Sequence, residues 1–266
     1  MKEWLRGQST ISTLKRIDLG GTRVTPSDIR QLKSAFPDAE TIPSGVFDPQ
    51  EELAVELLIG AGARPTWGKS GRVSSVYIRE EASPKVFDAL LDVKQCSHVN
   101  LRVGSDLTLE RISRCANLVS VGIQDASAVS DAGVSHLANL PRLQSLSLRD
   151  SNVSDAGLAH LVGLERLSLR GAPLTGVGFA ELRSLRKLTY LTLTSTQTND
   201  RGLAHIGALH SLGRLTLDGT SITDLGLVSL IDCVHLTAIS AVGTEITDGG
   251  IKVLQEQLPR CSVYLK

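Results

Sequence analysis

The chain has 266 residues, of which 41% are hydrophobic and only 3% aromatic, so its core must be built mainly from Leu, Val, Ile and Ala. Its 28 basic and 28 acidic residues cancel, which argues against binding to nucleic acid or to a membrane surface, because phosphate binding needs an excess of positive charge on one face. The polar start at residues 1–4 and the lack of any apolar run approaching about 18 residues indicate neither a signal peptide nor a membrane span, so we expect a cytoplasmic protein.

The first elements expected in chain order are a strand at residues 14–19 and a helix that begins at Pro26, because proline is favoured at the first helical position. Leu14, Ile17 and Leu19 follow a strand pattern that recurs later in the chain. A single strand and helix of this kind cannot bury its own apolar face. We therefore interpret residues 1–45 as a short N-terminal repeat unit that packs on the segment after it.

A second helix is expected over residues 50–60. Asp48, Pro49 and Glu51 have the spacing of an N-cap, a first-turn proline and the third residue of a capping box, and Gly60 or Gly62 can end the helix. We interpret residues 46–72 as a capping or joining helix with its loop. One face of the helix is expected to carry its apolar side chains, namely Leu53, Ala54, Leu57 and Leu58.

From residue 73 onwards the pattern L-x-x-L-x-L recurs, and each copy predicts one short strand. The copies that start at Leu164, Leu188, Leu212 and Leu236 are 24 residues apart. Such a period is typical of stacked repeats rather than of a compact domain with a single core. We therefore interpret residues 73–266 as the main repeat array.

Each strand is followed by a second recurring phrase, T-x-I-T-D-x-G-L, which is clearest at residues 220–227. It predicts a tight turn and then a short helix, with Ser154, Thr223 and Thr247 as N-caps. The Asp after each cap falls in the positive first turn, where we expect it to stabilise its own helix. The copy at residues 172–179 has lost this Asp, and we expect the middle of the array to be irregular.

Stacking these units predicts the fold. Neighbouring strands lie about 4.8 Å apart, whereas neighbouring helices need about 8–10 Å. An array with strands on one side and helices on the other must therefore bend. The expected fold is an α/β solenoid, a horseshoe with a parallel concave sheet and convex helices.

The two phrases together resemble the leucine-rich-repeat superfamily, specifically its bacterial type with T-x-I-T-D-x-G-L repeats. The likeness covers residues 70–266 and one further copy at 14–42. Cys115 and Cys233, each three residues before the first strand Leu, are similar to those of the cysteine-containing repeat subtype. The resemblance implies a fold and, less specifically, a role in binding other proteins.

Motifs of catalysis and metal binding have simpler explanations here. Residues 63–70 match a loosened phosphate-binding loop, but a helix precedes them and a strand follows, the reverse of what phosphate binding needs. His136, His160 and His205 share one position on the helical side, where adjacent helices lie too far apart to place all three on one metal ion. The sequence has no Ser-His-Asp, Cys-His or HExxH arrangement. We expect no enzyme activity.

The four cysteines are expected to be buried free thiols in a reducing compartment, with disulfides or a zinc site as the alternative. They form no CxxC pair and have no His at zinc-finger spacing. We therefore predict no metal and no other cofactor. The cysteines are Cys96, Cys115, Cys233 and Cys261.

The candidate binding site lies on the concave face, to which the non-leucine strand residues point. A central column of small polar residues lets a partner approach closely, and the Arg and Tyr residues beside it are of the types enriched in binding hot spots. The alternative is that these arginines form exposed ion pairs with Asp150, Glu165 and Asp218. The predicted protein-binding residues are Arg149, Arg166, Arg170, Tyr190, Thr192, Arg214 and Thr216.

The function predicted from the sequence is therefore a non-catalytic scaffold or recognition module that binds a protein, such as one with an acidic segment. The alternative is a structural protein that assembles through its ends, in particular through the C-terminal edge at residues 263–265. An enzyme is the remote alternative. We expect neither nucleic acid nor a membrane as a partner.

Overall fold

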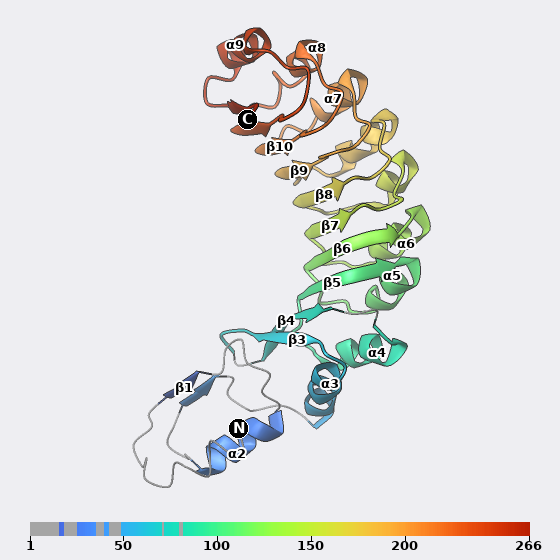
Figure 1. Ribbon diagram of the computed structural model, residues 1–266, viewed down its shortest axis with the longest axis vertical. Coiled ribbons are helices and arrows are strands. Elements are labelled where there is room, and N and C mark those ends of the chain that lie inside the picture. The colour runs from blue at the N-terminus through green and yellow to red at the C-terminus, as the bar shows by residue number, and fades with distance from the viewer. Residues whose placement is uncertain (1–15, 19–25, 36–39, 43–48, 71, 80–81) are drawn as a thin grey trace. The chain divides into compact units, whose positions relative to one another are not determined.

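A computed structural model describes residues 16–18, 26–35, 40–42, 49–70, 72–79 and 82–266 (Figure 1). The chain divides into two compact units, Met1–Asn100 and Leu101–Lys266. No helix in the described part of the chain is long and apolar enough to cross a membrane.

The first unit contains two strand pairs and three helices among its described residues. β1 and β2 pair in parallel, and β3 and β4 pair antiparallel. The elements are β1 (Arg16–Asp18), α2 (Pro26–Ala35), β2 (Glu40–Ile42), α3 (Pro49–Gly60), β3 (Arg64–Trp67), β4 (Val73–Ile78) and α4 (Pro84–Asp92).

Helix α2 begins at Pro26, as expected from the preference of proline for a first turn. It buries Ile29 and Leu32, and Arg30 forms an ion pair with Glu52 of α3. Helices α2 and α3 are therefore in contact, and the packing of residues 1–45 on α3 as a repeat unit stays a prediction. Residues 1–15 and 43–48, including the expected strand start at Leu14 and the expected cap at Asp48, lie outside the described residues.

The predicted apolar face of α3 is right for Ala54 and Leu58, which are buried, and wrong for Leu53 and Leu57. Leu53 is 67% exposed, and the buried positions are those three, four and seven residues after Glu51. Glu51 itself is fully buried and its carboxylate accepts a hydrogen bond from Arg72, so the expected capping-box glutamate also forms an ion pair. The segment expected as a loop after α3 contains β3, and the loosened phosphate-loop motif thus forms a strand and the connection to β4.

The second unit repeats one strand and one helical segment along its length. The helical segments are α-helices in some repeats and 3₁₀ helices (η) in others. The elements are β5 (His98–Ser105, which begins in the first unit), α5 (Asp106–Ile112), β6 (Ser120–Ala128), α6 (Asp131–Ser135), η1 (His136–Asn139), β7 (Ser145–Arg149), η2 (Asp155–His160), β8 (Arg166–Arg170), η3 (Val177–Ser184), β9 (Tyr190–Thr192), α7 (Asp200–Ile206), β10 (Arg214–Thr216), α8 (Asp224–Val228), β11 (Ala238–Ser240), α9 (Asp248–Gln257) and β12 (Ser262–Tyr264).

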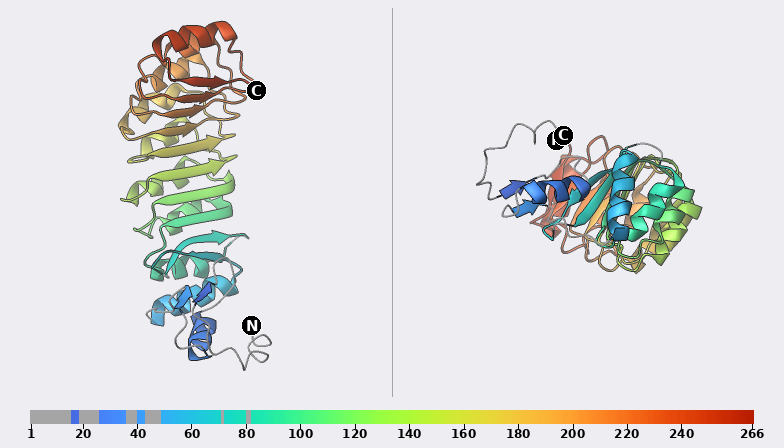
Figure 2. Two further views of the ribbon diagram at one scale, coloured as in Figure 1. Left: turned by 90° about the vertical axis from the view of Figure 1, so that its left-hand side faces the viewer. Right: turned by 90° about the horizontal axis from the view of Figure 1, so that it is seen from below.

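The strands of the second unit stack in chain order, and neighbours from β6 to β12 pair in parallel. Leu146, Leu167, Leu191, Leu215 and Ile239 are register partners, and all are buried. The second unit curves with its sheet on the inner side and its helices on the outer side (Figure 1), and the strands lie side by side when this sheet is viewed face on (Figure 2). The predicted parallel concave sheet with convex helices is confirmed.

Irregularity in the middle of this unit is also confirmed. The repeats that start at Leu143 and Leu164 carry 3₁₀ helices, η2 and η3, where later repeats carry α-helices. In η3 the cap position is Gly176, which has a left-handed φ of 99° and no capping side chain. A Cβ at Gly176 would come within 2.4 Å of the Gly202 Cα. The lost Asp of this repeat thus coincides with a close backbone contact between two repeats.

The Asp of the recurring T-D-x-G phrase has a second role, which the local sequence pattern did not indicate. In five repeats the Asp that follows the cap accepts hydrogen bonds from the cap residue or the equivalent residue of the next repeat. Asp131 accepts from Ser154 and Asp200 accepts from Thr223, in each case from both the backbone N–H and the hydroxyl. The five bonded pairs are Asp106–Ser130, Asp131–Ser154, Asp155–Thr175, Asp200–Thr223 and Asp224–Thr247.

Candidate functional site

The open face of the second unit's sheet carries the predicted binding residues in aligned rows. Arg166, Tyr190 and Arg214 are direct register partners on β8, β9 and β10. Both arginines are exposed and Tyr190 is 37% exposed. Strand spacing of about 4.8 Å places the two arginine stems about 10 Å apart, with the phenol between them. The structure thus brings these three predicted residues together.

Thr192 and Thr216 belong to a central column of half-buried polar residues. They pair with each other and with Ser168 and Ser240 on the flanking strands. Their small side chains leave the middle of the sheet accessible. They lie two residues further along their strands than Tyr190 and Arg214, and they point to the same face because side chains alternate along a strand.

Arg149 and Arg170 lie together at the far ends of β7 and β8, where they are register partners. Arg170 is four residues beyond Arg166 on the same strand, about 13 Å away. Arg149 forms an exposed ion pair with Asp150, with 3.6 Å between Nε and Oδ2. These two arginines therefore form a separate pair across the central column from the Arg166–Tyr190–Arg214 row.

The ion-pair alternative holds for Arg149 alone among the site arginines. In the part of the chain that the structure describes, no carboxylate pairs with Arg166, Arg170 or Arg214. The Asp218 carboxylate is occupied elsewhere, because it accepts hydrogen bonds from the Ser240 hydroxyl at 2.7 Å and from the Val242 N–H at 2.9 Å. The row's two guanidinium groups therefore keep their donors for solvent or a partner.

A hollow of about 610 Å³ opens beside this row. Its walls include three residues that the sequence reading did not select, Thr189, Gly213 and Thr237, each of which directly precedes the first residue of a strand. Its lining residues are Arg166, Thr189, Tyr190, Gly213, Arg214 and Thr237. We call it the sheet hollow.

Gly213 explains why the sheet hollow exists. The equivalent position carries a side chain in the flanking repeats, Thr189 and Thr237, whose hydroxyls donate to the Glu165 and Gly213 carbonyls at 3.1 and 3.0 Å. A Cβ at Gly213 would meet its nearest neighbour, the Thr189 carbonyl oxygen, at 3.5 Å, an ordinary contact. Packing therefore does not require a glycine here, and the missing side chain leaves open space. A single glycine within an otherwise filled column was the sequence signal for it.

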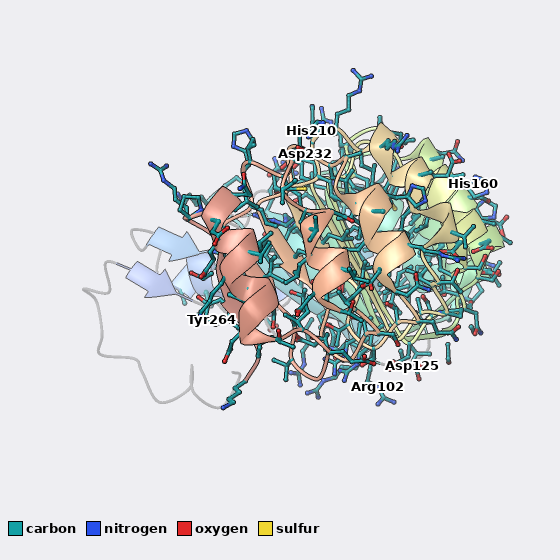
Figure 3. The ribbon with its side chains drawn as sticks, turned by 90° about the horizontal axis from the view of Figure 1, so that it is seen from above. Arg102, Asp125, His160, His210, Asp232 and Tyr264 are labelled. Carbon is teal, nitrogen blue, oxygen red and sulfur yellow. The ribbon has the colours of Figure 1, made fainter. Side chains whose placement is uncertain are left out.

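The outer side of the unit carries the histidine column. His160 ends η2 and is exposed, and Figure 3 shows it on the helical side of the second unit. Among the described residues, no group of three or more His, Cys, Asp or Glu side chains is placed to hold a metal ion.

All four cysteines are free thiols, and three of them are buried. Burial raises the pKa of Cys233 to about 11, and the neighbouring Asp232 charge acts in the same direction. Burial likewise raises the pKa of Cys115 and of Cys261 to about 11. These thiols stay protonated at neutral pH, whereas a nucleophilic cysteine needs a lowered pKa.

The fold can be compared with known proteins on this basis. No protein-family model matches the sequence, and no curated protein matches it either. Among solved structures, the internalin InlF of Listeria monocytogenes is similar over 84% of this chain with a TM-score of 0.56. The chain has the leucine-rich-repeat fold. At 21% sequence identity the likeness concerns the fold alone, and the chain spans 64% of the length of that structure.

Within this leucine-rich-repeat fold, the Arg166–Tyr190–Arg214 row occupies the strand face rather than the helical face. The leucines that define the repeats are buried in the layer below. The row can therefore vary without disturbing the core, which is how such solenoids offer an extended surface on a constant frame.

Proposed function

We propose that the protein is a non-catalytic recognition module that binds a partner protein on the open face of the second unit's sheet. The partner contributes an acidic segment, whose carboxylates are held by Arg166 and Arg214 on either side of Tyr190. The observation that carries the proposal is the sheet hollow, which has two arginines without carboxylate partners in the described chain on its walls.

The chemistry of the row suits carboxylates. A guanidinium group can donate two parallel hydrogen bonds to one carboxylate, and such charge-assisted bonds are about twice as strong as neutral ones. Tyr190 offers a rigid ring and a hydroxyl between the two charges, and Tyr and Arg are enriched in binding hot spots. The sheet hollow itself has room for a few side chains of the partner.

The other predicted residues enlarge the area of contact with the partner and are not its main anchors. A stable protein interface buries about 1,200–2,000 Å² in total, more than the sheet hollow offers. Thr192 and Thr216 extend the contact along the central column, and Arg149 and Arg170 extend it to the opposite ends of the strands. A partner covering both arginine groups spans all five residues of β8.

Two supporting observations concern the class of protein and its surroundings. The raised pKa values of the thiols speak against cysteine nucleophiles, which fits a binding role better than catalysis. Buried free cysteines fit a reducing compartment such as the cytoplasm.

Self-association remains the second candidate function, because the edge strand β12 pairs with β11 and carries Tyr264, which is 54% exposed. An open strand edge can add a strand from another chain. Replacing Val263 by Pro removes an N–H from that strand. If self-association is the function, sedimentation at high concentration detects dimers of the unaltered protein that this variant lacks.

The test of the recognition module uses the full chain and fluorescein-labelled hexaglutamate as the probe. Fluorescence anisotropy gives its Kd for the unaltered protein, for R166A/Y190A/R214A and for Gly213→Gln. The triple variant removes both charges and the ring, and Gly213→Gln fills the sheet hollow without changing the charge. We expect each to weaken binding at least tenfold. Arg201→Ala is the matched control, because it removes one exposed charge from α7 on the helical side.

An unchanged melting temperature in the triple variant shows that the loss of hexaglutamate binding comes from the altered site and not from unfolding. Hexaglutamate bound equally by the unaltered protein, the triple variant and Gly213→Gln would overturn the proposed site. Binding weakened equally by Arg201→Ala would show attraction by overall charge rather than by the row.

A further inference from the structure

A second hollow, of about 300 Å³, lies on the edge of the second unit where the chain enters strands β9 and β10. Three cationic or titratable side chains surround it: Arg183 at the end of η3, Arg186 just before β9, and His210 just before β10. Its lining residues are Arg183, Leu185, Arg186, Ala208, Leu209, His210 and Ser211. We call it the edge hollow.

The two hollows are built on the same two connecting segments. Arg186 is three residues before Thr189, and His210 is three residues before Gly213, and Thr189 and Gly213 both line the sheet hollow. The segments are tied together by the Ser211 hydroxyl, which donates to the Leu188 carbonyl at 2.9 Å, and by the Gly213 N–H, which donates to the Thr189 carbonyl at 3.0 Å. Three residues reach at most about 10 Å, and less here because residues 186–187 and 210–211 form turns.

The two arginines and the histidine of the edge hollow have no carboxylate partner within the described chain. No carboxylate there pairs with Arg183, Arg186 or His210. The His210 ring nitrogen Nδ1 lies 3.2 Å from the Asp232 backbone carbonyl oxygen, which fixes the ring on the next connecting segment. The arginines are exposed, so they are ready to bind an anionic group.

The two edges of the sheet differ in charge. Figure 3 shows His210 and Asp232 on one side of the second unit and Arg102 and Asp125 on the opposite side, where the strands end. Basic residues predominate in the segments that enter the strands, whereas the opposite edge carries both charges. The basic residues of the entering segments are Arg114, Arg142, Arg183, Arg186, Lys187 and Arg260, and the opposite edge carries Asp125, Asp150, Asp218 and Glu245 together with Arg102, Arg149 and Arg170.

We propose that the acidic segment bound at the sheet hollow continues over the strand-start edge into the edge hollow. This extension rests on the proposed function and specifies its partner. The segment carries carboxylates over more than six residues, and it runs from Arg214 and Tyr190 past Thr189 and Gly213 to Arg183 and Arg186. The excess of basic residues in the segments that enter the strands sets its direction.

A protein segment fits this surface better than a nucleic acid. Glu165 precedes Arg166 and Asp232 adjoins His210, so the positive charge is interrupted. A continuous row of phosphates would meet these carboxylates, whereas a peptide can place uncharged residues there. Single-stranded nucleic acid also needs several rings on which its bases stack, and Tyr190 is the one aromatic residue that lines the two hollows.

The test compares two labelled peptides of equal length on the full chain. One is twelve glutamates, and the other is six glutamates followed by three Gly-Ser pairs. We expect the unaltered protein to bind the twelve-glutamate peptide at least tenfold more tightly. R183A/R186A removes this advantage and leaves the affinity for the six-glutamate peptide unchanged. The matched control, R201A/K252A, removes two positive charges from the helical side and keeps the advantage.

Each other result decides against the extension. Equal affinity of the two peptides for the unaltered protein, or an advantage that survives in R183A/R186A, overturns it while leaving the proposed function intact. Binding of neither peptide overturns both. Tighter binding of a dodecathymidylate than of the twelve-glutamate peptide, lost in R183A/R186A, would assign the edge hollow to nucleic acid instead.

Discussion

The Asp131 carboxylate accepts two hydrogen bonds from Ser154, one residue of the next repeat: the backbone N–H at 2.8 Å binds Oδ1 and the hydroxyl at 2.6 Å binds Oδ2. Ser154 in turn caps η2 by accepting from the Ala156 N–H. The first turn of α6 is thereby joined to the N-cap of η2 in the next repeat. A Cβ at Gly157 would come within 2.3 Å of Asp131 Oδ1, which explains the glycine that follows two residues after the Asp of the phrase.

Replacing Asp131 by Ala should destabilise the protein by about 1.5–3 kcal/mol, because hydrogen bonds to a charged group contribute about this much and the Ser154 donors are left without it. Chemical denaturation measured by circular dichroism gives the change in the free energy of unfolding. The stability of Asp131→Asn, which keeps one acceptor oxygen, should lie between that of the unaltered protein and that of Asp131→Ala.

Asp248 provides the matched control. It has the same place in the first turn of α9, but no group in the described chain donates to its carboxylate. Asp248→Ala should therefore cost only the interaction with the helix dipole, about 0.3–1 kcal/mol. Equal losses in the two alanine variants would show that the bonds between repeats add nothing to stability.

The hydrogen bonds between repeats also predict that the stability of the fold depends on pH. The Thr247 N–H and hydroxyl donate to Asp224 at 2.8 and 2.7 Å, and these bonds lower the pKa of Asp224 below its ordinary value. A carboxyl whose folded pKa lies below its unfolded value of about 3.9 stabilises the fold above that pH. This stabilisation is lost as the pH falls through the folded pKa.

The measurement is the difference in melting temperature between the unaltered protein and Asp224→Asn from pH 7 to pH 2.5. We expect a constant difference in favour of the unaltered protein down to about pH 4 and a shrinking one below it. A difference that stays constant or widens below pH 3 contradicts the assignment of these hydrogen bonds to the ionised carboxylate.

Much of this arrangement could be predicted from local sequence. The 24-residue spacing placed Leu191 and Leu215 in the buried layer, and Tyr190 and Arg214 in one row on the open face, because alternation along a strand is a local property. The caps at Thr223 and Thr247 were predictable for the same reason. The hydrogen bonds between repeats were not predictable, since the Asp of one repeat accepts from a residue about 23 positions away.

The errors have similar causes. The face of α3 was misassigned because the burial of Glu51 depends on Arg72, which is 21 residues further along. The sheet hollow went unnoticed because reading a sequence for binding residues selects side chains that are present. Gly213 acts through the absence of a side chain. That absence leaves open space only because the flanking repeats carry Thr189 and Thr237 at the same position.

Two glycines of the same repeat should therefore respond oppositely to alanine. Gly219 has a φ of 65°, and a Cβ in the left-handed region costs about 1–2 kcal/mol. The equivalent turns tolerate Asp150 and Ser195 at φ values of 57° and 56°, so we expect Gly219→Ala to fold but to lose stability by this amount.

Gly213 has no left-handed φ, and an added Cβ makes only ordinary contacts there. Gly213→Ala should be neutral or stabilising by up to about 1 kcal/mol, because alanine reduces the conformational freedom of the unfolded chain. Urea midpoints of the two variants test the pair. If Gly213→Ala lowers the free energy of unfolding as much as Gly219→Ala does, then the fold requires a glycine at position 213. If Gly213→Ala leaves stability unchanged and Gly213→Gln still weakens hexaglutamate binding, then this glycine is required to keep the sheet hollow open.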